Sequence, residues 1–217
     1  LIGGLAPRDA ASLATYRDVV GGGFEAIFRR RLEDVGPVER TNIEQRQAET
    51  HRIERCRLAA PRHGETVTAT FLVPAREGGP VVVWATDRGS EGILSDGRPI
   101  PPVAAILKAG VTVAGVDLLG QAADAPSELR GPNRRVKNPR EFAGYTYGYN
   151  DPIFVQRVHD LLTVVAHARS LRPGSTEVHL VGASTAGPWV AAAAALCGPA
   201  VDKVAIDTPG TNDGSRK

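Results

Sequence analysis

The stretch between residues 177 and 197 constrains the fold of this chain more than any other. An apolar run at 177–181 predicts a buried strand, and residues 182–186 (GASTA) predict a tight turn of small side chains. Residues 187–197 (GPWVAAAAALC) predict a helix that can pack closely on a sheet. A buried strand that leads through a turn into a helix is the unit from which parallel α/β sheets are built.

The same alternation runs through most of the chain. Further buried strands are predicted at 80–85, 111–118 and 201–206, with helices at 103–109 and from 151 to about 168. Asp151 or Asn150 is expected to cap the second of these helices. Residues 53–60 and 66–73 predict a β-hairpin. We therefore expect an α/β fold with a mostly parallel, doubly wound sheet, preceded by an N-terminal helical segment and a β-hairpin.

Three zones organise the chain. Residues 1–60 form an Arg-rich N-terminal segment with apolar side chains at helical spacing between 13 and 28, although the glycines at 21–23 should weaken or bend that helix. Residues 61–217 form the α/β core. An insertion at 121–150, rich in Pro, Gly, Arg and Tyr, should lie at the carboxyl edge of the sheet, where ligands bind in open α/β folds.

Composition excludes several classes of protein. The 217 residues suffice for one substantial domain, and a net charge of +2 gives no reason to expect a nucleic-acid partner. No apolar run approaches the roughly 18–20 residues that span a bilayer. The five histidines show no metal-ligand spacing, so we expect no metal and no cofactor. The chain contains no Met, even at position 1, so we expect it to be trimmed at its N-terminus.

Ser184 lies at the apex of the turn at 182–186. The pattern matches the Gly-x-Ser-x-Gly nucleophile elbow, with Ala186 in place of the last glycine. Small side chains are needed there because the backbone at the nucleophile is strained and its neighbours approach closely. The turn also directs the N-terminus of the next helix toward the serine, so that the Thr185 N–H could stabilise an oxyanion.

A dinucleotide-binding loop is the competing interpretation. Residues 182–187 match G-x-G-x-x-G except for Ser184 at the middle glycine, and Asp207 follows at the spacing of a ribose-binding acid. Ser carries a side chain where a pyrophosphate needs bare backbone, and a dinucleotide-binding domain opens with this unit, whereas here it comes late. An oxidoreductase domain is therefore the less favoured alternative, and a strand–turn–helix with no chemistry is a third.

These residues resemble the α/β-hydrolase superfamily, in particular its bacterial acetyl-xylan-esterase-like and dipeptidyl-peptidase-like branch. The resemblance runs from about residue 67 to 210, on the segments PVVVWATDRG, VTVAGVDLLGQ, GYTYGYNDPIFVQRVHDLL, VHLVGASTAGPWVAAAAAL and VDKVAIDTPG. It implies a serine esterase that acts through an acyl-enzyme on small-molecule or polymer esters.

The resemblance also implies residue roles. Ser184 would be the nucleophile, and Asp207, after the strand that follows the elbow, the catalytic acid. Thr185 would supply one oxyanion donor, and the loop after the first buried strand, around Asp87 or Arg88, the other. Three further side chains of the insertion would line the substrate pocket or pack it onto the sheet: Tyr145, Tyr147 and Tyr149.

The catalytic histidine is the main departure from the family pattern. The triad order in this fold is Ser, acid, His, yet no His follows position 179. Three explanations stay open: a fragment that lacks its last strands, a short form that takes its base from His159, His63 or a partner chain, and an inactive, binding-only relative. An unpaired sheet edge after Ile206 would favour a homodimer or pairing with another chain.

Overall fold

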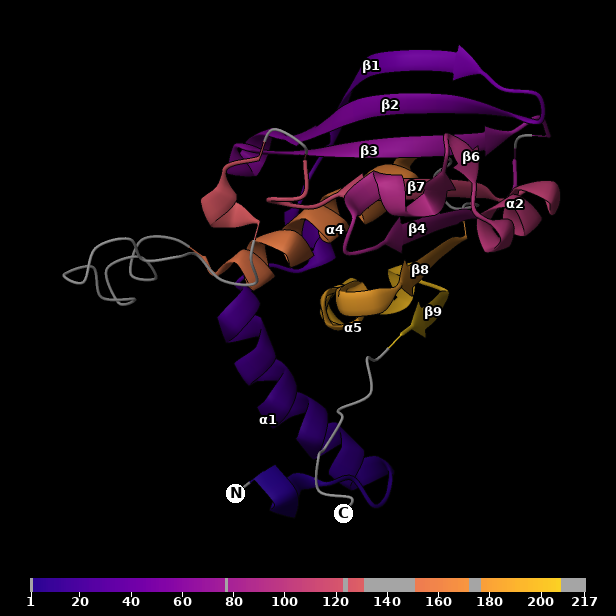
Figure 1. The fold of residues 1–217 in the computed structure, drawn as a ribbon. Coiled ribbons are helices and arrows are strands. Elements are labelled where there is room, and N and C mark those ends of the chain that lie inside the picture. The colour runs from indigo at the N-terminus through magenta and orange to yellow at the C-terminus, as the bar shows by residue number, and fades with distance from the viewer. Residues whose placement is uncertain (1, 77, 123–124, 131–150, 172–176, 208–217) are drawn as a thin grey trace, which may run out of the picture.

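The computed structural model describes residues 2–76, 78–122, 125–130, 151–171 and 177–207. Its centre is a seven-stranded sheet in the order β1-β2-β3-β7-β4-β8-β9 (Figure 1). The strands of this sheet are β1 (Glu39–Gln47), β2 (His51–Ala60), β3 (Glu65–Pro74), β4 (Val81–Ala85), β7 (Thr112–Asp117), β8 (Val178–Gly182) and β9 (Lys203–Ile206). A two-stranded sheet pairs β5 (Leu94–Ser95) with β6 (Arg98–Pro99).

The strand pairing changes from antiparallel to parallel at β7. The first four strands in spatial order, β1, β2, β3 and β7, pair antiparallel, whereas β7, β4, β8 and β9 run parallel. The predicted hairpin is confirmed as β2 and β3. The buried strands predicted at 80–85, 111–118 and 177–181 appear as β4, β7 and β8, and the strand predicted at 201–206 appears as β9, all with shifts of one or two residues at their ends. Strand β9 is exposed along its whole length. The α/β sheet expected from the alternating pattern is therefore present.

Helices cover both faces of the sheet. Helices α4 (Ile153–Ser170) and α5 (Gly187–Cys197) pack on one face, and α2 (Pro101–Lys108) packs on the other (Figure 1). Along α4, four side chains are fully buried at helical spacing: Val158, Leu161, Leu162 and Val165. Burial of each such side chain stabilises the fold by about 1.5–3 kcal/mol, so the amphipathic pattern of this helix accounts for its position.

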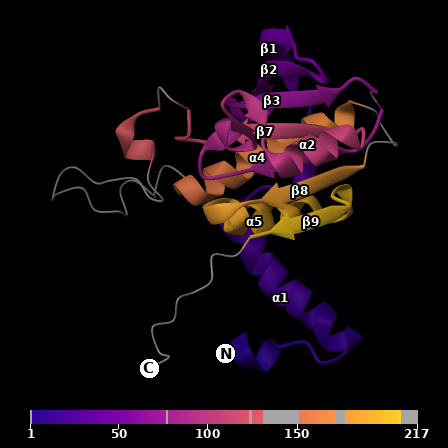
Figure 2. The ribbon, with the colours of Figure 1, turned by 45° about the vertical axis from the view of Figure 1, so that its right-hand side comes forward.

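Helix α1 (Ala10–Phe28) projects away from the sheet (Figure 2). Asp9 caps it by accepting a 2.7 Å hydrogen bond from the Ser12 amide, and the helix continues through the three glycines without a break. Among its residues only Phe28 is buried, where it meets Phe24 and Phe154. The α1 helix is thus anchored at its C-terminal end.

Two details differ from the sequence predictions. Pro152 is the N-cap of α4, and Asp151 makes an ion pair with Arg29 instead of capping the helix; Asn150 lies outside the described residues. Strand β1 was not predicted, because nearly all of its side chains are exposed and it therefore shows no alternation of apolar and polar residues. The predicted division between residues 1–60 and 61–217 falls in the turn that joins β2 to β3, within one sheet.

Candidate active site

Ser184 has a left-handed backbone at the carboxyl end of β8. Its φ is 57°, and it opens a short 3₁₀ turn, η6 (Ser184–Ala186), that runs directly into α5. Among the non-glycine residues that the structure describes, only Arg29, Asp96 and Ser184 have a positive φ. A non-glycine residue in this region costs free energy of order 1–3 kcal/mol and tends to occur at functional sites. The geometry is that expected of a nucleophile elbow.

Two glycines make this turn possible. A Cβ at Gly182 would lie 2.9 Å from the Cβ of Val190, and a Cβ at Gly187 would lie 2.1 Å from the Asp207 carbonyl oxygen. Real Cβ atoms do not approach this closely, so helix α5 and strand β9 can meet the turn only because both positions lack side chains. The second obligatory glycine is therefore Gly187, one position later than in Gly-x-Ser-x-Gly.

Asp207 lies beside the elbow at the end of β9. The Ser184 amide donates to its Oδ2 at 3.3 Å, and the Asp207 amide donates to the Gly182 carbonyl at 2.8 Å. The carboxylate thus contacts the backbone of the predicted nucleophile. The carboxylate also occupies the Ser184 N–H that a pyrophosphate would need. Two anions at that position would repel each other, so the geometry argues against a dinucleotide.

The loop after β4 faces the elbow. The Ala183 amide donates to the Ala85 carbonyl at 3.0 Å, which ties the two strand ends together. Buried Thr86 shapes the turn, since its hydroxyl accepts from the Arg88 amide at 3.0 Å and donates to the Gly89 carbonyl at 2.9 Å. The Arg88 amide, one of the two predicted oxyanion donors, is therefore already bound within the turn.

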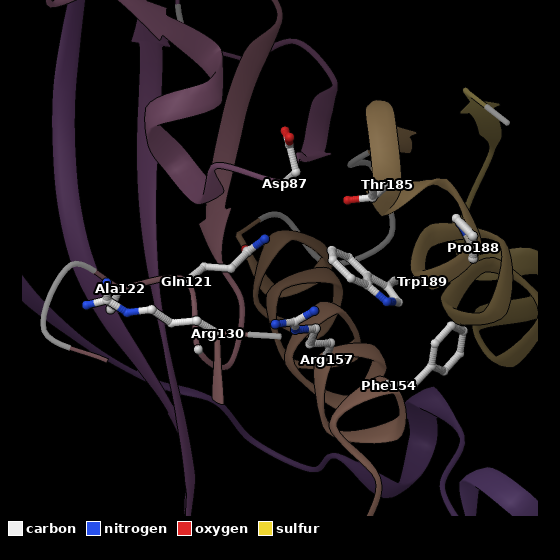
Figure 3. A pocket seen from close by; sticks show the side chains of 10 residues that line it. Asp87, Gln121, Ala122, Arg130, Phe154, Arg157, Thr185, Pro188 and Trp189 are labelled. Atoms are coloured by element: carbon white, nitrogen blue, oxygen red, sulfur yellow. The ribbon is translucent and has the colours of Figure 1, made fainter. Parts of the chain in front are cut away.

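A cavity of about 580 Å³ opens between this loop and the elbow (Figure 3). Asp87 and Thr185 stand on opposite sides of its rim, and Phe154, Pro188 and Trp189 form an apolar wall. Gln121, Arg130 and Arg157 add polar groups to its lining, and Arg157 lies beside Trp189 (Figure 3). Thr185 lines the cavity, whereas Ser184 is not among its lining residues.

None of the five histidines, all of which the structure describes, has a recorded contact with Ser184. Buried His159, the base suggested by the sequence, engages the Phe28 carbonyl through Nε2 at 2.9 Å, and its Nδ1 lies 3.8 Å from Glu65. His63 engages the Asp34 carbonyl, and His179 lies 3.7 Å from Glu177. His51 contacts Thr50, and His167 packs against Phe71, where burial lowers the pKa of its imidazole to about 4. The structure therefore lends no support to His159 as the base.

The predicted pocket tyrosines, Tyr145, Tyr147 and Tyr149, lie outside the described residues. Most of the other residues that line the cavity were not predicted as site residues, and two of them, Gln121 and Arg157, make contacts that shape it. Gln121 donates to the Thr86 carbonyl at 2.7 Å and accepts from the Leu118 amide at 2.9 Å, so it links the loops after β4 and β7. Arg157 is 4% exposed within the apolar stripe of α4. A charged residue on the apolar face of a predicted helix was the sequence signal that could have identified it.

One carboxyl close to the cavity has a strongly shifted pKa. Burial raises the pKa of Asp160 to about 8, although its Oδ2 accepts a 2.7 Å hydrogen bond from the Leu119 amide, which acts in the opposite direction. Burial also lowers the pKa of Arg157, one turn earlier on α4. Within the described residues, no three acidic, His or Cys side chains come together as a metal site. None of the helices described is long and apolar enough to cross a membrane.

No family model and no curated protein sequence matches this chain. Solved structures do resemble it. Acetyl xylan esterase 1 from Thermoanaerobacterium sp. JW/SL YS485 matches with a TM-score of 0.58 and 20% identity over 83% of this chain and 56% of its own. A putative acetyl xylan esterase from Bacteroides fragilis matches with a TM-score of 0.61 and 12% identity over 89% and 53%. A glucuronoyl esterase from Solibacter usitatus matches with a TM-score of 0.52 and 14% identity over 86% and 56%.

The fold is therefore that of an α/β-hydrolase, in the form found in acetyl xylan esterases and glucuronoyl esterases. The predicted resemblance and fold class are both confirmed at the level of the fold. The chain spans between 53% and 56% of the length of these three neighbours.

Proposed function

We propose that the chain is a serine-dependent carboxylic ester hydrolase that works through an acyl-enzyme on Ser184. The observation that carries this proposal is the left-handed Ser184 at the apex of a strand–turn–helix, held between two glycines that admit no side chain. A strained serine at this position of an α/β sheet exposes its hydroxyl above the strand ends. The fold shared with known esterases supports the same chemistry.

In the proposed reaction, Ser184 Oγ attacks the ester carbonyl carbon, and the carbonyl oxygen becomes an oxyanion. The amides of Thr185 and Asp87, two residues that line the cavity, would donate hydrogen bonds to it. A general base takes the hydroxyl proton of Ser184 during the attack and gives it to the leaving oxygen as the tetrahedral intermediate collapses, so that the alcohol departs and the acyl group stays on Ser184. Attack by water then releases the carboxylic acid and restores the hydroxyl.

None of the five histidines is placed to act as the general base of this mechanism. Without a base the serine hydroxyl is a poor nucleophile, and the loss is typically about 10³–10⁶-fold in rate. We propose that an imidazole from outside these five completes the site. Asp207 then has the role of an acceptor that holds the Ser184 backbone in place.

The substrate is proposed to be a carboxylic ester, either a small molecule or one borne on a polymer. The cavity has an apolar wall that suits an acyl group and polar groups that suit hydroxyl-bearing alcohols. Acetylated xylan fragments are the first substrates to assay, because the structural neighbours are acetyl xylan esterases. The alternative is an α/β-hydrolase-like domain that only binds. It is favoured by the fact that the five histidines contact groups other than Ser184.

Chemical rescue separates the two proposals. Hydrolysis of p-nitrophenyl acetate is measured for the wild-type chain and for Ser184→Ala, with imidazole added from 0 to about 100 mM, below the concentrations at which solvent effects dominate. Free imidazole also cleaves this ester, and Ser184→Ala measures that background. Esterase function predicts a wild-type rate that rises with imidazole above the variant's rate. Equal rates at every concentration would favour the binding-only domain.

A further inference from the structure

Arg157 is a buried charge in the part of α4 that faces the cavity. Its neighbours on that helix, Val155 and Val158, are 2% and 0% exposed, and Arg157 itself is 4% exposed. Burial of a charge is costly unless hydrogen bonds and a matching environment compensate for it. A long apolar side chain at this position would pack with less cost, so the guanidinium requires an explanation.

The guanidinium joins three segments that surround the cavity (Figure 3). Its Nε donates to the Leu119 carbonyl at 2.9 Å, and its Nη2 donates to the Leu129 carbonyl at 3.3 Å. Its Cζ lies 4.5 Å from the centre of the Trp189 ring, a cation–π contact. One side chain of α4 therefore contacts the loop after β7, the 3₁₀ turn η5 (Ser127–Leu129) and the first turn of α5.

These three segments carry much of the site. Trp189 follows the predicted nucleophile by five residues and forms the apolar wall of the cavity. Gly120 and Gln121 directly follow Leu119, and Gln121 binds the Thr86 carbonyl of the proposed oxyanion loop. A Cβ at Gly120, whose φ is 82°, would lie 1.9 Å from the Leu129 carbonyl oxygen. The loop after β7 and the turn η5, to which Arg157 donates its hydrogen bonds, are therefore in close contact with each other.

We infer that Arg157 is a positioning residue of the proposed esterase site, which fixes Trp189 against the loop after β7 and so sets the size of acyl group that the cavity accepts. The inference rests on the proposed function for its catalytic consequence, but not for the contact between Arg157 and Trp189. Lysine cannot replace arginine here, because a planar fork is needed to reach two carbonyls and to stack on an indole ring at once.

Acyl-chain selectivity tests the catalytic consequence. kcat and KM are measured with imidazole present for p-nitrophenyl acetate, butyrate and hexanoate on the wild-type chain, Arg157→Lys and Arg169→Lys. Arg169 lies near the end of the same helix and serves as the control. A single methylene in a well-formed apolar pocket changes kcat/KM by about tenfold or more, so we expect Arg157→Lys to change the acetate-to-hexanoate ratio by at least about fivefold. An unchanged ratio in a folded Arg157→Lys chain would overturn the inference.

Fluorescence tests the contact without any activity. The chain has two tryptophans, so Trp84→Phe leaves Trp189 as the only indole. In that background we expect Arg157→Lys to shift the emission of Trp189 and to increase its quenching by acrylamide, with Arg169→Lys unchanged. Identical spectra and quenching would refute the positioning role. If the spectra change but Ser184→Ala hydrolyses esters as fast as the wild-type chain, the proposed function fails while the structural role of Arg157 stands.

Discussion

The Ser184 amide donates a hydrogen bond to the Asp207 carboxylate across the gap between β8 and β9. The bond joins the elbow to the strand that follows it, and the Asp207 amide completes the link through the Gly182 carbonyl. An exposed carboxylate therefore helps to hold a strained serine in place.

Replacement of Asp207 should distinguish this acceptor role from a role of its charge. Asparagine retains an acceptor oxygen, whereas alanine does not, so we expect Asp207→Ala to lower the free energy of unfolding by about 0.5–1.5 kcal/mol and Asp207→Asn to change it by less. Urea denaturation measures both. The imidazole-rescued rate should follow the same order. Equal loss in the two variants would mean that the charge matters and the hydrogen bond does not.

The close approach of Gly187 to β9 gives a second prediction. A methyl group there would meet the Asp207 carbonyl, so Gly187→Ala should destabilise the chain by about 1–3 kcal/mol and impair Ser184-dependent hydrolysis. Gly21→Ala is the matched control, because a Cβ at Gly21, inside α1, has nothing within 4 Å. That substitution should stabilise the chain by about 0.5–1 kcal/mol. Thermal unfolding of the two variants provides the comparison, and a neutral Gly187→Ala would contradict the packing argument.

The raised pKa of Asp160 predicts a pH dependence with a definite sign. Its pKa in the folded state is about 8, above its ordinary value of 3.8, so the folded chain retains a proton that the unfolded chain releases. The stability that this carboxyl contributes is complete below about pH 4 and is lost as pH rises toward and through 8. Asp160→Asn, which retains an acceptor for the Leu119 amide, should remove this part of the pH dependence.

The difference in unfolding free energy between the two chains is the quantity to measure. Burial opposes charge on Glu65, but its interactions with His159 and Arg30 outweigh burial and lower its pKa to about 2. The contribution of Glu65 is therefore lost only as pH falls below its ordinary pKa of 4.5, outside the range in which Asp160 acts. Chemical denaturation of both chains at pH 5, 7 and 9 tests the sign. A difference that stays constant across these values would contradict the burial of the Asp160 carboxyl.

Among the described residues β9 is the last strand on its side of the sheet, and this exposed edge predicts self-association. Every residue of β9 is exposed, and Val204 and Ile206 leave 43% and 39% of their surface in solvent. An edge strand with apolar side chains is a template for pairing with a second copy. We expect a concentration-dependent dimer by sedimentation, weakened by Val204→Lys and unaffected by Val19→Lys on α1. A monomer at all concentrations would exclude this contact.

The sequence predicted the parallel core because buried strands and amphipathic helices have periods that can be read directly. Strand β4 is a continuous apolar run, and α4 carries a regular apolar stripe. The elbow was predictable for a related reason, since only small residues fit at 182, 186 and 187. Strand β1 was not, because a polar edge strand is held by backbone hydrogen bonds that leave no pattern in its side chains.

The cavity could be predicted only in part. Thr185 and Asp87 follow strand ends and so were expected at the carboxyl edge of the sheet, where both lie. The contacts of Gln121 and Arg157 depend on how two loops fold over α4, and no local pattern records that. The partners of His159 likewise follow from the packing of α1 and β3 against its ring, which sequence spacing does not contain.

Covalent labelling is the most direct test of whether Ser184 is a nucleophile. The chain is incubated with an organophosphonate ester in the presence of imidazole, digested, and analysed by peptide mass spectrometry. If Ser184 is the nucleophile, a phosphonyl adduct appears on the peptide that contains it. The adduct forms faster with imidazole and is absent from Ser184→Ala. A correctly folded chain that acquires no adduct, or that is labelled equally when Ser184 is alanine, would contradict a nucleophilic role for this residue.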